Sequence, residues 1–272
     1  MGYLTTDKKK ITAKTLLEMK AAGEKITQMT AYDFTTASII DAAGIDSILV
    51  GDSASNVMAG NQDTTPITVD QMIYHARAVV RACHHCLVVC DMPFGSYQVS
   101  REDGIRNAIR IIKETGAGAV KMEGGKEIAD TVKGIVDAGI PVIGHLGLTP
   151  QSIHKFGGYG LRAKEDTEAE KLIEDALALD AAGVSGITLE KVPAAVANKV
   201  TAMVKAATIG IGAGNGTDGQ VLVYADALGM TSGFKPKFLR HFANVNKCMT
   251  EGVMEYIRCV KSESFPSEAE SY

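Results

Sequence analysis

The stretch Ser47-Ile-Leu-Val-Gly-Asp52 is a short, apolar and β-branched run that ends in a carboxylate. Three further runs have the same character: Leu87-Val-Val-Cys-Asp91, Ala119-Val-Lys-Met-Glu123 and Gly186-Ile-Thr-Leu-Glu190. Runs of this length, separated by helical stretches, are typical of buried parallel strands. We therefore expect each of the four acids to lie where a buried strand reaches the surface.

Strand-like and helix-like stretches alternate along the whole chain. The expected strands are residues 26–32, 47–52, 87–91, 119–123, 141–145, 186–190, 208–212 and 220–224. Most of the helical stretches between them end at a glycine, the usual residue after a helix. Eight such strands within about 200 residues predict a closed α/β barrel, the (β/α)₈ or TIM barrel, rather than an open sheet. The first strand-to-helix turn, Thr30–Phe34, also lacks the glycine fingerprint of a dinucleotide-binding fold.

The length of 272 residues predicts one barrel domain over residues 1–272, because such barrels commonly take about 250 residues. Residues 12–22 predict a short amphipathic helix ahead of the barrel, ending at Gly23. Residues from about 262 to 272 contain several Ser and Glu, and we expect them to form a loose tail.

The composition argues against nucleic acid and membranes as partners. The net charge is −4, aromatic residues make up 6% of the chain and Trp is absent. There is neither an apolar run of the ~20 residues that span a bilayer nor a signal-peptide pattern at the start. The five cysteines are odd in number and unevenly placed, which favours reduced thiols in a cytoplasmic protein. Cys83-His84-His85-Cys86 has the spacing of a metal knuckle, but no second pair accompanies it, which argues against a zinc finger.

Asp52, Asp91 and Glu123 end neighbouring strands of the expected barrel. Adjacent strands lie about 4.7–4.9 Å apart, so their side chains could reach one ion. Oxygen ligands without His or Cys favour Mg²⁺ or Mn²⁺ over zinc. The alternative is that some of these acids only cap the loops that follow.

Lys121 precedes Glu123 by two residues, so both side chains should face the barrel interior. Lys121 could hold a carboxylate, stabilise an enolate, form a Schiff base or simply pair with Glu123. Glu190 lies across the barrel from the three other acids and is the candidate general base. The alternative is a structural role, in which its carboxylate stabilises the N-terminus of the helix that starts near Pro193. His145 ends the fifth strand and is the weakest of the candidates, since an interior His is as often structural as catalytic.

Two further features accompany these residues. Ser53 adds a hydroxyl beside Asp52, and no His at a readable spacing supports a serine nucleophile. The glycine-rich segment Gly210–Gly216 follows the seventh strand, where it could bind phosphate or make a tight turn.

Eight motifs occur in one order along the chain, with the spacing of a known family. They are Thr30-Ala-Tyr-Asp33, Val50-Gly-Asp-Ser53, Cys90-Asp-Met-Pro-Phe-Gly-Ser-Tyr97, Val120-Lys-Met-Glu-Gly-Gly125, Gly144-His-Leu-Gly-Leu-Thr-Pro-Gln151, Phe156-Gly-Gly-Tyr159, Leu189-Glu190 and Ile209-Gly-Ile-Gly-Ala-Gly-Asn215 through Asp218-Gly-Gln220. Over residues 10 to 250 or so, the chain closely resembles the ketopantoate hydroxymethyltransferase family.

The resemblance implies a Mg²⁺-dependent TIM barrel of the phosphoenolpyruvate/pyruvate superfamily, usually a decamer. It implies hydroxymethyl transfer from 5,10-methylenetetrahydrofolate to the 2-oxoacid 3-methyl-2-oxobutanoate, giving 2-dehydropantoate for pantothenate biosynthesis. The family's metal ligands fall on Asp52, Asp91 and Glu123. Its 2-oxoacid contacts fall on Asp52, Ser53, Asp91 and Lys121, and its proton acceptor falls on Glu190.

The chain departs from the family pattern at Lys191, where Cys is typical, at Lys205–Thr208 before the seventh strand, and at Ala59–Thr64. These departures touch neither the metal ligands nor the base. The hypothesis is therefore that Glu190 removes the C3 proton of a metal-chelated 2-oxoacid and that the enolate attacks the folate methylene carbon. The alternatives are a lyase or mutase of the same superfamily acting on another 2-oxoacid, and a non-catalytic barrel.

Overall fold

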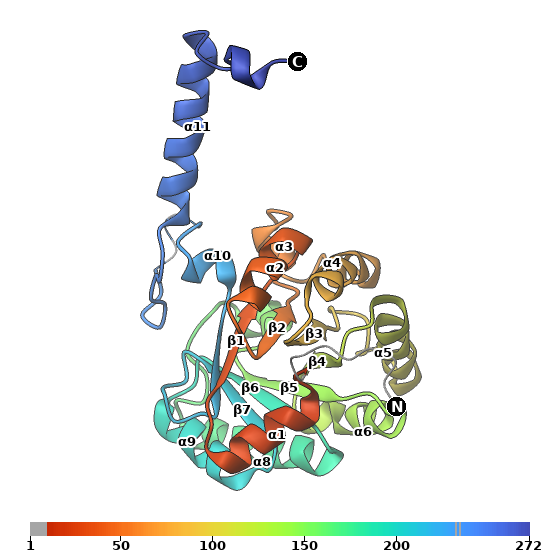
Figure 1. Ribbon diagram of the computed structural model, residues 1–272. Helices are drawn as coiled ribbons and strands as arrows, with labels where there is room; N and C mark the ends of the chain where they lie inside the picture. Colours follow the sequence, from red (N-terminus) through yellow and green to blue (C-terminus); the bar gives the residue numbers. More distant parts are fainter. Residues whose placement is uncertain (1–9, 232, 234) are drawn as a thin grey trace. The chain divides into compact units, whose positions relative to one another are not determined.

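The computed structural model describes residues 10–231, 233 and 235–272, and the chain divides into two compact units, Met1–Leu222 and Val223–Tyr272. In the first unit, eight parallel strands form a closed barrel in chain order, and β1 pairs with β8 to close it (Figure 1). The predicted TIM barrel is confirmed. The barrel lies in the first unit, and the expectation that residues 223–272 belong to the same domain stays a prediction.

The barrel strands lie close to their predicted positions. They are β1 (Ile26–Thr30), β2 (Ser47–Val50), β3 (Leu87–Asp91), β4 (Ala119–Glu123), β5 (Val142–Gly147), β6 (Gly186–Glu190), β7 (Ala207–Ile211) and β8 (Gly219–Leu222). Since β2, β3 and β4 are buried along their whole length, their sequences are mainly apolar, and their charged residues are those of the site.

Helices connect these strands on the outside of the barrel. They are α2 (Phe34–Ala42), α4 (Val69–Ala82), α5 (Arg101–Thr115), α6 (Ala129–Asp137), α8 (Asp166–Ala182) and α9 (Ala194–Met203). Short elements also occupy the loops after β2, β4 and β5, where the sequence pattern is too short to reveal them. These are α3 (Ala54–Val57), η1 (Lys126–Ile128), η2 (Pro150–Ser152) and α7 (Ile153–Phe156).

The helix α1 (Ala13–Ala22) closes the N-terminal end of the barrel (Figure 1). Thr12 caps its first turn, and Gly23, with φ of 72°, ends it in the left-handed conformation that glycine adopts without strain. Leu16 and Met19 pack into the apolar cluster that strand residues form near the N-terminal end of the barrel. Burial of Leu16 contributes about 1.5–3 kcal/mol to stability. The barrel is therefore filled at this end, and polar groups gather at the other.

The second unit contains α10 (Tyr224–Ala227), α11 (Val245–Lys261) and the short η3 (Glu268–Glu270). No residue of α11 is buried. The expectation of a loose tail from residue 262 stays a prediction. Within the described part of the chain, no helix is both long enough and apolar enough to cross a membrane.

Candidate active site

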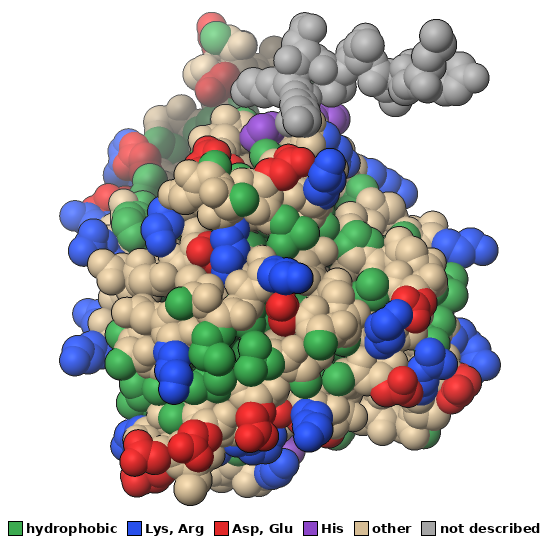
Figure 2. Space-filling model, turned by 90° about the horizontal axis from the view of Figure 1, so that it is seen from below, with side chains coloured by type: hydrophobic (Ala, Val, Ile, Leu, Met, Phe, Trp, Pro, Cys, Tyr) green, Lys and Arg blue, Asp and Glu red, His purple; other side chains and the backbone are tan. Residues whose placement is uncertain are grey.

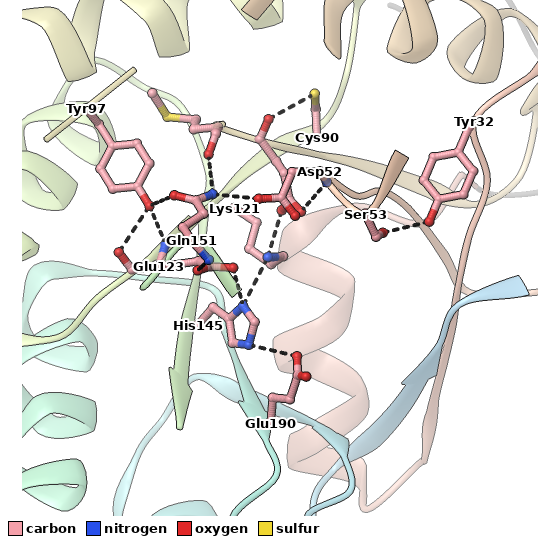
Figure 3. Close-up of polar contacts among 12 residues, drawn as sticks. Tyr32, Asp52, Ser53, Cys90, Tyr97, Lys121, Glu123, His145, Gln151 and Glu190 are labelled. Atoms are coloured by element: carbon pink, nitrogen blue, oxygen red, sulfur yellow. Dashed lines mark hydrogen bonds and ion pairs between the residues drawn. The ribbon is translucent and has the colours of Figure 1, made fainter. Parts of the chain in front are cut away.

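The carboxyl ends of β2 to β6 bring the predicted site residues together (Figure 3). In the barrel register, Asp91 pairs with Lys121 and Glu123 pairs with His145. Asp52 follows β2 directly, and Glu190 ends β6. All of these side chains except that of Glu190 are buried, so their charges must be balanced within the site.

Lys121 and Asp91 form a buried ion pair. Lys121 Nζ lies 2.8 Å from Asp91 Oδ1, and the other oxygen of Asp91 accepts the backbone N–H of Asp52 at 2.9 Å. Burial alone would lower the pKa of Lys121, but the charges of Asp91, Glu123 and Asp52 raise it above its ordinary value. A Schiff base needs a neutral amine, so this environment favours Lys121 as a permanent cation.

Asp52 occupies the least favourable position for a charge. Burial and the nearby charges of Asp91 and Glu123 raise its pKa well above the ordinary value, with Lys121 opposing them. Gln151 Nε2 donates a hydrogen bond to Asp52 Oδ2 at 2.8 Å. Three buried carboxylates face two cationic side chains, Lys121 and His145, so an excess of negative charge remains that a cation would relieve.

Tyr97 and Gln151 hold Glu123 in place. The hydroxyl of Tyr97 accepts the backbone N–H of Glu123 at 3.0 Å and donates to Gln151 Oε1 at 2.7 Å. The backbone N–H of Gln151 donates to Glu123 Oε2 at 2.9 Å. Both residues belong to the family-like motifs, but neither was assigned to the site from the sequence. They lie in loops, and nothing in the local pattern shows which distant carboxylate they bind.

His145 joins the buried carboxylates to Glu190 (Figure 3). Its Nδ1 lies 3.2 Å from both Glu123 Oε1 and Lys121 Nζ, and its Nε2 lies 3.4 Å from Glu190 Oε2. Burial and Lys121 lower the pKa of His145, but Glu123 and Glu190 outweigh them and raise it to about 9. The weakest of the sequence candidates thus lies at the centre of the cluster.

Glu190 is the most accessible acid of the group, with its side chain 18% exposed. Gly147, at the end of β5, lies against it: a Cβ there would come within 2.3 Å of the Glu190 carbonyl oxygen. Lys191, which follows Glu190, has φ of 46° and donates from Nζ to the carbonyl of Tyr159. The side chain of Lys191 therefore holds the loop that contains Tyr159, and its ammonium group is hydrogen-bonded to a backbone oxygen of that loop.

Ser53 lies beside Asp52 at the start of α3, and its hydroxyl hydrogen-bonds to the hydroxyl of Tyr32 at 2.7 Å. A Cβ at Gly51 would come within 2.7 Å of Ser53 Oγ, so glycine is needed for this close approach. Tyr32 is a further site residue that was not assigned from the sequence.

The glycine-rich segment after β7 packs closely against α9. A Cβ at Gly214 would lie 2.6 Å from Ala194 Cβ, and one at Gly216 would lie 1.9 Å from Asn198 Oδ1. This packing accounts for the glycines without a phosphate, which favours the tight-turn interpretation of the segment.

The carboxylates of Asp52, Asp91 and Glu123 suit a hard divalent cation in kind, since they are oxygen donors with a shared excess of negative charge. Glu123 Oε1 and Asp91 Oδ1 are buried without a hydrogen bond in the described residues, although each has an ion-pair partner. The ligand oxygens of the three acids do not all lie within 4.8 Å of one another in residues 10–231, 233 and 235–272. Ligand oxygens bound directly to Mg²⁺ lie at most about 4.2 Å apart, so in this arrangement at least one of the three carboxylates would reach the ion through one of its water ligands. That these three residues are the metal ligands stays a prediction.

Solved structures with a similar barrel identify the class of fold. The 2,3-dimethylmalate lyase of the PEP mutase/isocitrate lyase superfamily aligns with a TM-score of 0.62 at 16% identity, over 91% of this chain and 88% of that chain. A phosphonopyruvate hydrolase in complex with oxalate and Mg²⁺ aligns with a TM-score of 0.61 at 12% identity, over 96% of this chain and 93% of that chain. The protein is thus a TIM barrel of the type found in that superfamily.

Sequence relatives identify the family. The family model for ketopantoate hydroxymethyltransferase matches residues 10–268. The 3-methyl-2-oxobutanoate hydroxymethyltransferase of Flavobacterium johnsoniae is 59% identical over 272 residues, covering 100% of both chains. The enzyme of that name from Bacteroides fragilis is 57% identical over 271 residues, covering 100% of this chain and 99% of that protein. The chain belongs to the ketopantoate hydroxymethyltransferase family, and the prediction that it is a transferase is confirmed.

Proposed function

We propose that this protein transfers a hydroxymethyl group from 5,10-methylenetetrahydrofolate to 3-methyl-2-oxobutanoate, giving 2-dehydropantoate in pantothenate biosynthesis in the cytoplasm. The observation that carries the proposal is the division of the acids into two kinds. Asp52, Asp91 and Glu123 are buried around Lys121, whereas Glu190 is partly exposed and joined to them through His145. The buried group suits an anionic substrate with a cation, and Glu190 suits proton transfer.

Asp52, Asp91 and Glu123 would hold the Mg²⁺ that members of this family are expected to use. When bound, Mg²⁺ would withdraw electron density from the 2-oxo group of the substrate and make its C3 proton more acidic. The complex of the phosphonopyruvate hydrolase with oxalate and Mg²⁺ supports a metal in barrels of this type.

The protein's own groups bind and orient the 2-oxoacid. Lys121, held by Asp91, presents a cation to the substrate carboxylate, and Ser53 presents a hydroxyl. The hydrogen bond between Tyr32 and Ser53 fixes where that hydroxyl lies. These contacts hold the substrate so that its C3 atom faces a single base.

Glu190 is that base. Its carboxylate accepts the C3 proton, and His145 keeps the carboxylate oriented through the Nε2 contact at 3.4 Å. The two electrons of the broken C3–H bond remain on the substrate as an enolate. The enolate carbon then forms a bond to the methylene carbon of the folate, and the first C–N bond to that carbon breaks with its electron pair left on nitrogen. The second C–N bond breaks in turn, and water supplies the hydroxyl group, so that tetrahydrofolate leaves and 2-dehydropantoate is formed.

The test is proton NMR of 3-methyl-2-oxobutanoate in D₂O with the protein, with and without Mg²⁺ and without folate. We expect loss of the C3 proton signal with Mg²⁺, and an exchange rate reduced about 100-fold or more in Glu190→Gln. The variant should still bind the 2-oxoacid, which saturation-transfer NMR measures. Unchanged exchange in Glu190→Gln would show that another group is the base. No exchange together with no folate-dependent turnover would favour a lyase or mutase acting on another 2-oxoacid.

We further propose a homo-oligomer, a decamer by family resemblance, that binds neither nucleic acid nor membranes. The first unit leaves large apolar side chains exposed, among them Ile39 at 65% and Tyr74 at 74%, as expected of surfaces that pair with another copy. On the face shown in Figure 2, basic and acidic side chains are interspersed, which is unlike a nucleic-acid-binding surface. Light scattering coupled to size-exclusion chromatography measures the subunit number, and a monomer would contradict the proposal.

A further inference from the structure

A second cluster of potential ligands lies at the N-terminal end of β3, the opposite end of that strand from Asp91. Cys83 directly follows α4, Cys86 directly precedes β3, and Asp41 lies in the last turn of α2. The ligand atoms of Asp41, Cys83 and Cys86 all lie within 4.8 Å of one another. In the part of the chain that the structure describes, no other set of three His, Cys, Asp or Glu side chains is so tightly grouped.

Asp41 holds the segment that carries the two thiols. Its carboxylate accepts the backbone N–H groups of His84 and Cys86 at 2.9 Å each, and that of His85 at 3.2 Å. These bonds fix residues 83–86 against α2 and bring both sulfurs next to a carboxylate. Asp41, Cys83 and Cys86 are all buried. The arrangement therefore exists before any ligand binds.

The donor set is that of a site for a borderline-soft transition metal. Two cysteines separated by two residues have the spacing of structural zinc sites, and Asp also binds zinc. The sequence alone argues against a zinc finger because no second Cys or His pair follows. The structure supplies the third donor from α2, about forty residues earlier in the chain, where no spacing rule would find it.

His85 belongs to the same segment, but its ring nitrogens lie outside the 4.8 Å group in the described residues. Its Nδ1 is buried and has no hydrogen-bond partner in the described residues. Buried polar atoms are rarely left unpaired, and a metal ion is one explanation of an exception. Simple packing explains the buried thiols, and the three backbone N–H groups explain the Asp41 carboxylate, but neither explains this unpartnered nitrogen.

We propose that Asp41, Cys83 and Cys86 bind one divalent transition-metal ion of the zinc type, and that the His85 ring moves to bring its Nδ1 in as the fourth ligand. The ion replaces the two thiol protons, so each binding event forms two metal–sulfur bonds and releases two protons. The site joins the end of α2 to the start of β3 and is separate from the carboxylates at the other end of the barrel. It does not depend on the proposed function.

The test uses the full-length, reduced protein after removal of metals by a chelator. Co²⁺ is added, because thiolate-bound cobalt has a sulfur-to-metal charge-transfer absorption that carboxylate-bound cobalt lacks. We expect this absorption to saturate at one Co²⁺ per chain and to disappear when Zn²⁺ is added. It should be lost in Cys83→Ser and in Cys86→Ser, and Asp41→Asn should weaken Co²⁺ binding about tenfold or more.

Matched controls separate this site from other sites on the chain. Cys248→Ser and Cys259→Ser change two thiols outside the cluster and should keep the absorption. Asp91→Asn changes the active-site carboxylates and should also keep it. Because the cluster variants could fail to fold, the wild-type protein gives a second measurement: addition of Zn²⁺ in weak buffer should release two protons per ion bound.

Three results would overturn the proposal. The first is a folded wild-type protein that shows no sulfur-to-cobalt absorption. The second is an absorption that survives in both Cys83→Ser and Cys86→Ser. The third is a disulfide between Cys83 and Cys86 in protein isolated without oxidant, because its sulfurs could not then be ligands.

Discussion

Replacement of Lys121 by Met tests whether Lys121 neutralises the buried carboxylate of Asp91. Lys121 Nζ lies 2.8 Å from Asp91 Oδ1, and the two side chains are 4% and 3% exposed. Removal of one member of a buried ion pair typically costs about 3–5 kcal/mol, because the other charge is left without a partner. At these exposures solvent screens little, so we expect Lys121→Met to lose a free energy of unfolding in this range without divalent metal.

The pH dependence of this loss has a definite sign. Burial already raises the pKa of Asp91, and Lys121 opposes that rise. Without Lys121, the pKa of Asp91 in the folded state moves further above the value of about 3.9 in the unfolded chain. A carboxyl whose pKa is raised by folding destabilises the protein where it is ionised, and protonation removes the penalty as the pH falls. Lys121→Met should therefore lose less stability near pH 5 than near pH 8.

Urea unfolding of the wild type, Lys121→Met, Asp91→Asn and the double variant measures these free energies, with a chelator present. The double variant should be about 1–3 kcal/mol more stable than Lys121→Met, because the unpaired charge is gone. A loss below about 1 kcal/mol in Lys121→Met, or a double variant no more stable than the single one, would refute the reasoning. Either result would mean that another group neutralises Asp91.

Three further predictions concern other parts of the barrel. Gly147→Ala should lower kcat about 10–100-fold at unchanged substrate affinity, because a Cβ would come within 2.3 Å of the Glu190 carbonyl oxygen and displace the base. Steady-state kinetics measures both quantities, and a kcat equal to that of the wild type would contradict the prediction. In metal-free protein, NMR should show His145 titrating with a pKa of about 9. In Glu190→Gln the pKa of His145 should be lower, because one of the groups that raise it is removed. A wild-type pKa near 6.5 would show that Glu123 and Glu190 do not stabilise the protonated ring. Leu16→Ala should lower the free energy of unfolding by about 2–5 kcal/mol in urea titrations while kcat at 25 °C stays unchanged, and a lowered kcat would show that the closed end of the barrel influences the site.

The sequence predicts the barrel and the positions of its acids because both follow from local patterns. Continuous apolar runs such as Leu87–Asp91 mark strands that are buried on both faces. The two-residue alternation places Lys121 and Glu123 on one face of β4, and the structure brings both to His145. Strand ends differ from the prediction by two residues at most, since the hydrogen-bonded ladder stops before the apolar run does in β1 and β2.

The remaining contacts depend on residues far apart in the chain. Tyr97 and Gln151 are 54 positions apart, and Gln151 and Asp52 are 99 positions apart. Polar residues in loops show no periodicity, so the sequence indicates neither their partners nor their order of contact. Asp41 illustrates the same limit, because its place on α2 reads as an ordinary helix-end acid until folding brings it to Cys83 and Cys86.

The position of α1 also constrains how the chain matures as it is synthesised. Lys20 on α1 donates from Nζ to the carbonyl of Ala206 at 2.9 Å and pairs with Asp218 at 3.0 Å. The contacts that α1 makes through Lys20 are thus complete only after nearly all of the barrel has been made. Until then part of the apolar cluster that buries Leu16 and Met19 is missing from the nascent chain, and chaperones recognise exposed apolar segments. A ribosome-bound fragment that stops before β7 cannot close its barrel, and it lacks Asp218, the residue next to β8 that holds α1 through Lys20.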